Sequence, residues 1–141
     1  MECNYCERRC ELSDGKYGVC QMYCAEGGTV NERFPDRWCT YGVSRIESMP
    51  FYHAYPGSRC MTIGTFGCNL ECRYCSNAYI ARENPDHFRG TMYEFTAGEL
   101  VKMAAKLGCH NIVFNVNEPT VSLPSLQRVA AVAKTAGLPL G

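Results

Sequence analysis

Three closely spaced cysteines are the residues of this chain best suited to chemistry. Cys68, Cys72 and Cys75 lie in one run with the spacing C-x3-C-x2-C. Three thiolates can bind three irons of a four-iron cluster. No fourth cysteine follows at short range, so the fourth iron would keep an open coordination position, as reactive metal centres do. The spacing therefore predicts a cluster that reacts with a bound ligand.

The same thiols allow other arrangements. They could form a three-cysteine zinc site, a redox pair of Cys72 and Cys75 alone, or a set of free thiols. A second motif favours the cluster. The run Asn117-Glu118-Pro119-Thr120 directly follows a predicted strand, where carbonyl oxygens and a carboxylate can bind an ammonium group. Asn115 and Asn117 share one face of that strand near its carboxyl end, where they could contact a ligand. The alternative is that they cap the strand end or hydrogen-bond a neighbouring loop.

A third group of cysteines lies at the amino terminus, in the pattern Cys3-x2-Cys6-x3-Cys10-x9-Cys20. Four soft ligands in a short, turn-rich stretch indicate a second metal site, holding zinc or an iron–sulfur cluster. Free or disulfide-bonded thiols are the alternative. With eleven cysteines in all, a secreted disulfide scaffold is conceivable, but the close spacings favour metal ligation in a reducing cytoplasm.

The elements that must position these motifs follow an α/β pattern from residue 59 onward. Residues 60–66 read as a strand that runs into the cysteine loop, and residues 112–116 as a second strand. Thr96 and Glu99 form a capping-box signature for an intervening helix that ends at Gly108. A second helix follows Pro124 and ends at Gly137, and residues 138–140 resemble the entry to a third strand. This order predicts parallel strands with right-handed crossovers.

The chain divides by composition into three parts. Residues 1–40 form a small cysteine-rich module, residues 41–58 a connector, and residues 59–141 the α/β core. Fourteen basic and fourteen acidic side chains balance, and no basic stripe suggests nucleic acid. No apolar run is long enough to span a membrane.

The cysteine run resembles that of the radical S-adenosylmethionine (SAM) enzymes. The resemblance implies that the open iron is chelated by the methionine part of SAM, and that reductive cleavage then yields a deoxyadenosyl radical that abstracts hydrogen. It also places Tyr74 near the adenine. The segment at Asn117, Glu118 and Pro119 resembles the family's Gly-Gly-Glu-Pro motif, which binds the amino group of the cofactor. Here Val116 and Asn117 stand in place of the two glycines.

The front of the chain is similar to a subgroup related to pyruvate formate-lyase activating enzyme. In that subgroup a comparable cysteine run precedes the segment that reads Tyr-His-Ala-Tyr-Pro-Gly-Ser at residues 52–58. The resemblance implies the front part of a partial (β/α) barrel, a flavodoxin or ferredoxin as reductant, an anaerobic setting, and a glycyl-radical enzyme as a protein substrate. We expect the barrel to be truncated after its second β/α unit and the fragment alone to be inactive. A non-enzymatic iron–sulfur or zinc module that carries electrons or binds a partner is the competing hypothesis.

Overall fold

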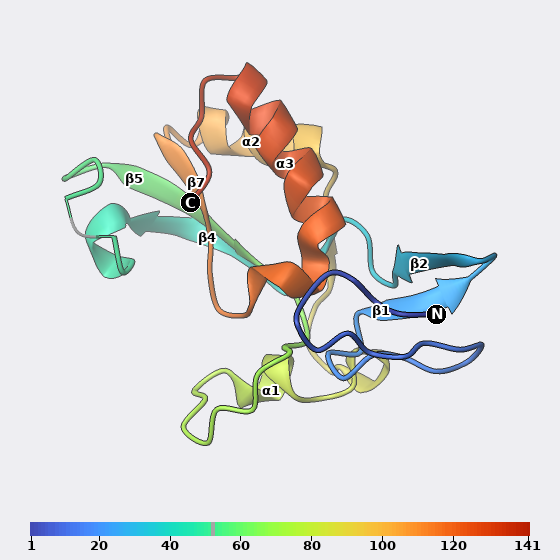
Figure 1. Cartoon of the computed structure of the whole chain (residues 1–141). Helices are drawn as coiled ribbons and strands as arrows, with labels where there is room; N and C mark the ends of the chain where they lie inside the picture. The colour runs from blue at the N-terminus through green and yellow to red at the C-terminus, as the bar shows by residue number, and fades with distance from the viewer. Residues whose placement is uncertain (52) are drawn as a thin grey trace.

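A three-stranded sheet forms the centre of the molecule. The computed structural model describes residues 1–51 and 53–141. The sheet has the order β4-β5-β7, with β4 at Thr40–Arg45, β5 at Arg59–Gly64 and β7 at Asn111–Phe114. Strands β5 and β7 are parallel, as predicted, whereas β4 is antiparallel to β5 (Figure 1).

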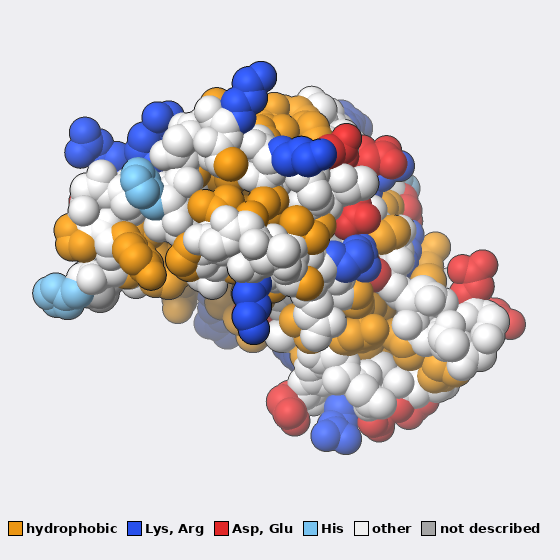
Figure 2. Space-filling model, turned by 90° about the horizontal axis from the view of Figure 1, so that it is seen from above, with side chains coloured by type: hydrophobic (Ala, Val, Ile, Leu, Met, Phe, Trp, Pro, Cys, Tyr) orange, Lys and Arg blue, Asp and Glu red, His pale blue; other side chains and the backbone are white. Residues whose placement is uncertain are grey.

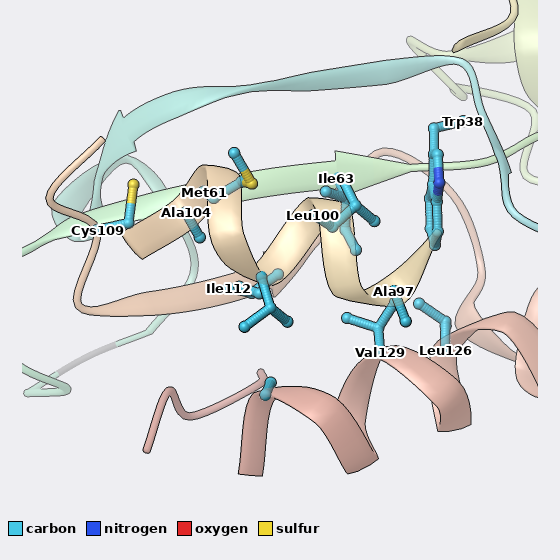
Figure 3. Close-up of a cluster of buried hydrophobic side chains, with 12 residues drawn as sticks. Trp38, Met61, Ile63, Ala97, Leu100, Ala104, Cys109, Ile112, Leu126 and Val129 are labelled. Atoms are coloured by element: carbon cyan, nitrogen blue, oxygen red, sulfur yellow. The ribbon is translucent and has the colours of Figure 1, made fainter. Parts of the chain in front are cut away.

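Two helices cover one face of this sheet. Helix α2 spans Ala97–Lys106 and helix α3 spans Leu123–Thr135, and both lie on the same side of the strands (Figure 1). Figure 3 shows the buried side chains between the helices and the sheet. The cluster consists of Trp38, Met61, Ile63, Ala97, Leu100, Val101, Ala104, Cys109, Ile112, Leu126, Val129 and Ala133. Burial of this apolar surface is the main favourable term that holds the helices on the sheet.

The helix boundaries follow from local sequence signals. The Thr96 side chain accepts a hydrogen bond from the Glu99 backbone at 3.3 Å, and the Glu99 carboxylate accepts one from the Thr96 backbone at 2.8 Å. This confirms the predicted capping box, which satisfies two otherwise unpaired amides. Gly108 and Gly137 adopt φ values of +68° and +70° just beyond the two helices, a conformation that glycine tolerates best.

Residues 41–58, for which we predicted only a connector, contain regular structure. Most of β4 lies there, followed by a 3-10 helix η1 at Ile46–Ser48. Ile46 and Met49 pack against Cys60 and Val113, on the sheet face opposite the helices. The Tyr-His-Ala-Tyr-Pro-Gly-Ser segment that resembles the activating-enzyme subgroup also lies in this stretch. Its Tyr52 falls outside the described residues.

The amino-terminal residues contain short antiparallel pairs. Strands β1 (Tyr23–Glu26) and β2 (Thr29–Glu32) form a hairpin around the Gly27-Gly28 turn. Strand β3 (Arg37–Trp38) pairs with β6 (Tyr93–Glu94). A second buried cluster joins this region to the rest of the chain through Cys3, Leu12, Cys20, Met22, Tyr23, Cys39, Phe66, Ile80 and Val121. Residues 1–40 thus share a core with segments far along the sequence.

Three short helices complete the structure: α1 (Ala78–Ala81), η2 (Pro85–His87) and η3 (Pro119–Ser122). Leu140 forms a parallel bridge with Ile112, where we predicted the entry to a third strand. The mixed α/β fold class is therefore confirmed, while the partial barrel and the three-part division remain predictions.

The surface and the helices bear on two further expectations. On the face shown in Figure 2, basic and acidic side chains are interspersed among apolar and neutral ones, in line with the balanced composition. The longest helix, α3, has 13 residues, and in the part of the chain that the structure describes no helix has both the length and the apolar character to cross a membrane.

Candidate functional site

The three predicted cluster ligands lie on one loop at the carboxyl end of β5. We call residues 65–77 the cluster loop. Cys72 is exposed, and Cys68 and Cys75 are half-buried. The carboxyl ends of parallel strands are where such folds bind ligands. The turn after β7 lies beside the cluster loop and is hydrogen-bonded to it.

Asn117 fastens the start of the cluster loop. Its Nδ2 donates to the backbone oxygens of Phe66 at 2.9 Å and Gly67 at 3.0 Å, and to Thr65 Oγ1 at 3.0 Å. Its Oδ1 accepts from the Thr65 backbone amide at 3.1 Å. The amide is therefore engaged at both ends with the residues that lead into Cys68. This is the loop-binding alternative raised by the sequence, and it makes Asn117 a positioning residue in this structure.

Asn77 fastens the end of the same loop. Its Nδ2 donates to the backbone oxygen of Val116 at 3.0 Å. Val116 and Asn117 together thus contact both ends of the cluster loop. A turn that lies 39 to 52 residues away in the sequence thus fastens both ends of the loop that carries the predicted ligands.

Val116 has an unusual backbone for a β-branched residue, with a φ of +86°. Only glycine adopts this region without steric cost. Val116 occupies the first of the two positions at which the resembled motif has glycine, so the backbone keeps a glycine-like conformation despite the substitution. Gly64 lies opposite, where an added Cβ would collide with the Val116 side chain. The strand end is therefore packed tightly against the turn.

Glu118 and Pro119 begin helix η3. Glu118 Oε1 accepts from the Thr120 backbone amide at 3.3 Å and from Thr120 Oγ1 at 3.1 Å. Asn69 of the cluster loop donates to Thr120 Oγ1 at 3.4 Å, and its own Oδ1 is buried without a partner among the described residues. Two acceptor side chains, one of them a carboxylate, thus flank Thr120. This arrangement suits a cationic ligand group.

Tyr74 projects from the loop with 91% of its surface exposed. The structure therefore leaves it free to contact a ligand but gives it no packing partner that would fix its position. Asn115, on the preceding strand end, makes a polar contact to the Met49 sulfur at 3.5 Å and is not joined to the cluster loop in the way Asn117 is.

The donor set of the cluster loop suits an iron–sulfur cluster. The Leu70 amide donates to Cys68 Sγ at 3.4 Å, the kind of backbone contact that orients a ligating sulfur. Within the described residues, no three Cys, His, Asp or Glu side chains converge on a point that would hold a single ion. A four-iron cluster needs no such convergence, because each cysteine ligates a different iron.

The amino-terminal cysteines are more buried and lie near one another. Cys3 and Cys20 are buried, and Cys6 and Cys10 are half-buried. Burial raises the pKa of the Cys20 thiol to about 11, a backbone hydrogen bond from Met22 lowers it, and repulsion from the Cys3, Cys6 and Cys10 thiols raises it again. The chain has no disulfide among its eleven cysteines, all of which the structure describes.

The amino-terminal segment packs directly on the cluster loop. Gly67, with a φ of +70°, has no room for a Cβ because the backbone oxygen of Cys20 lies against it. Arg8 Nε donates to the Asn69 backbone oxygen at 2.9 Å, and Cys20 and Cys68 line the same surface pocket. The two groups of cysteines are therefore neighbours.

The model of the Radical SAM superfamily matches residues 62–140, more than half of the chain. This chain belongs to the Radical SAM superfamily. Membership in the superfamily implies a four-iron cluster and SAM as cofactors, and the matched residues include the cluster loop and the Val116–Glu118 turn.

One curated relative extends the similarity beyond the Radical SAM region. The chain is 27% identical over 138 residues to "Uncharacterized protein MJ0808" of Methanocaldococcus jannaschii. The match covers 98% of this chain and 41% of that relative, so the chain spans well under half of the relative's length. No solved structure matches the chain.

Several residues of the site were not predicted from the sequence. Asn77, Asn69 and Thr120 connect the cluster loop to the turn after β7. Asn77 stands two places after Cys75, yet nothing in that spacing indicates its partner. The contact between Gly67 and Cys20 likewise depends on tertiary packing.

Proposed function

We propose that this Radical SAM chain reductively cleaves SAM to a deoxyadenosyl radical, with Cys68, Cys72 and Cys75 as the ligands of its cluster. The supporting observation is the pairing of a three-cysteine loop with an acidic turn at adjacent carboxyl ends of parallel strands. When bound, a cluster with one open iron supplies the electron and the chelation site for the methionine part of SAM.

The chain's own residues would bind and orient the cofactor. The Glu118 carboxylate, with its Oε1 held by Thr120, would accept a hydrogen bond from the cofactor's ammonium group. The unpartnered Asn69 Oδ1 would supply a second acceptor. Pro119 fixes the turn at the start of η3, and Tyr74 would close over the adenine. Asn117 and Asn77 would act as positioning residues for the loop.

The wider role is proposed from the resemblance of residues 52–77 to the pyruvate formate-lyase activating enzyme subgroup. We propose a partial barrel as the complete fold, a flavodoxin or ferredoxin as electron donor, and a glycyl-radical enzyme as protein substrate. A reducing, anaerobic cytoplasm would suit the eleven free thiols.

The test is deoxyadenosine formation by anaerobically reconstituted chain with dithionite and SAM. Wild type should release deoxyadenosine and methionine, and the Cys72→Ala variant should release neither. A reconstituted chain that binds iron and sulfide but leaves SAM intact would instead support the non-enzymatic electron-carrier alternative.

A further inference from the structure

The amino-terminal cysteines have no part in the chemistry proposed above, yet their backbone brings them together. The Cys3 amide donates to the Cys10 oxygen at 2.9 Å, and the Leu12 amide donates to the Met1 oxygen at 2.7 Å. Residues 1–3 and 10–12 therefore pair as antiparallel strands, with Cys3 opposite Cys10. Opposed residues in such a pair extend from the same face, with Cβ atoms about 5 Å apart.

The other two cysteines lie in turns that adjoin this pair. Cys6 is within the hairpin loop, where the Arg9 amide donates to its backbone oxygen at 3.2 Å. Cys20 is in the turn closed by the Gln21 amide and the Gly18 oxygen at 2.8 Å. A Cβ on Gly18 would lie 3.5 Å from Cys10 Sγ, so the Cys20 turn packs on the sulfur of Cys10.

The surroundings of these thiols resemble those of metal ligands. Cys3 and Cys20 are buried in one apolar cluster, and Cys10 packs against it. Thiolates gathered in such a place need a cation to balance their charge, whereas nearby backbone amides provide only partial charges. Backbone hydrogen bonds from Tyr5 to Cys3 and from Met22 to Cys20 are the kind of outer contacts that orient ligating sulfurs.

We propose that Cys3, Cys6, Cys10 and Cys20 bind one zinc ion in a closed tetrahedral site that supports the cluster loop. Four sulfur ligands leave zinc no open position, so the site is structural rather than catalytic. Among the described residues the four sulfurs do not converge on one point, so zinc binding would require their side chains to rotate until each Zn–S distance is about 2.3 Å. Because the Cys20 carbonyl packs on Gly67, zinc binding would also fix the wall beside Cys68.

The experiment uses the whole chain with Cys68, Cys72 and Cys75 changed to Ala, which removes the proposed cluster and its activity from the measurement. This background should contain about one zinc per chain after purification, as four-cysteine sites do. Cys6→Ser, at a half-buried position, should lose nearly all of the zinc, and so should Cys20→Ser. Cys24→Ser is the matched control and should keep it, because Cys24 lies in β1 outside the set. Cobalt in place of zinc should give the spectrum of a tetrahedral thiolate site.

Thermal unfolding provides a second readout that does not depend on metal analysis. A zinc chelator should lower the Tm of the Cys24→Ser chain and leave that of Cys6→Ser unchanged, since that variant has no zinc to lose. Full zinc content in both Cys6→Ser and Cys20→Ser would overturn the proposal, and so would iron and sulfide in place of zinc in the background chain. Neither result depends on whether the wild type cleaves SAM.

Discussion

The two groups of cysteines use the same ligand chemistry in opposite surroundings. The cluster loop presents three thiols, of which Cys72 is exposed, and its two ends are held by Asn77 and Asn117. The amino-terminal set presents four thiols, two of them buried, on a backbone that is paired internally. Ligand number and access thus separate the proposed open cofactor site from the proposed closed metal site.

The contrast also explains why the two groups are in contact. The Cys20 turn packs against the start of the cluster loop at Gly67, so it limits how far that part of the loop can move. Metal binding in the closed site would then limit the motion of the open one without taking part in its chemistry.

The largest expected effect separates the two sites completely. Changing Cys68, Cys72 or Cys75 to Ala should abolish a cluster of about four irons per chain, while the zinc of the amino-terminal set remains. Iron, sulfide and zinc analysis after anaerobic reconstitution measures both at once. Retention of iron and sulfide in all three variants would remove the cluster assignment, and joint loss of iron and zinc would show that the two sites are not separable.

The next effect tests the fastening of the cluster loop. Asn117→Ala should reduce the free energy of unfolding by about 2–3 kcal/mol, because it leaves backbone groups of residues 65–67 without their partner. Asn115→Ala is the matched control on the same strand end. It should cost less than about 1 kcal/mol, since among the described residues its side chain has only the polar contact to Met49. Urea unfolding of both variants decides this. Equal stability of the two would mean that Asn117 does not hold the loop.

Glu118→Gln tests the open site without disturbing its structure. The amide oxygen can keep the Thr120 contact, but the negative charge that attracts the cofactor's ammonium group is lost. We expect SAM to bind about tenfold more weakly, or about 1.4 kcal/mol, with unchanged iron content. Glu71→Gln, on the exposed part of the same loop, should bind SAM like the wild type in equilibrium titration. Wild-type affinity in Glu118→Gln would show that the carboxylate is not the amino-group site.

The smallest effect concerns the backbone at Val116. Both Val116→Ala and Val116→Gly remove the side-chain packing, so their difference isolates the conformational cost. Alanine normally stabilises a chain relative to glycine, but at a φ of +86° we expect Val116→Gly to be the more stable by about 1 kcal/mol. Thermal or urea unfolding of the pair measures this. The usual order, with alanine more stable, would mean that the turn relaxes to a negative φ.

Much of the helix and strand pattern could be predicted because its signals are local. The capping box at Thr96 and Glu99 fixes the start of α2, and the apolar periodicity that follows fixes its buried face. Strand β4 could not be found in this way, because its apolar residues Tyr41 and Val43 lie on the exposed side. Its partner β5 also lies beyond an irregular stretch.

In the candidate site, too, the local patterns could be predicted and the long-range contacts could not. The ligand spacing of the cluster loop is a local pattern and was readable, as was the acidic turn at Glu118. The role of Asn117 was left open between a ligand contact and a loop contact, and only the three-dimensional structure shows the hydrogen bonds to residues 65–67. The left-handed conformation of Val116 was hidden because a β-branched residue gives no indication of it.

Strand β4 limits how the sheet can be extended. It pairs with one edge of β5 and runs antiparallel to it, while Leu140 forms a bridge with β7 on the side away from β5. Both edges of β5 are therefore occupied, one by β4 and the other by β7. A ring of parallel strands that includes β5 would have to close on the edge that β4 covers. Such a ring could close only if β4 left the sheet, so the pairing of β4 keeps the sheet open on that side.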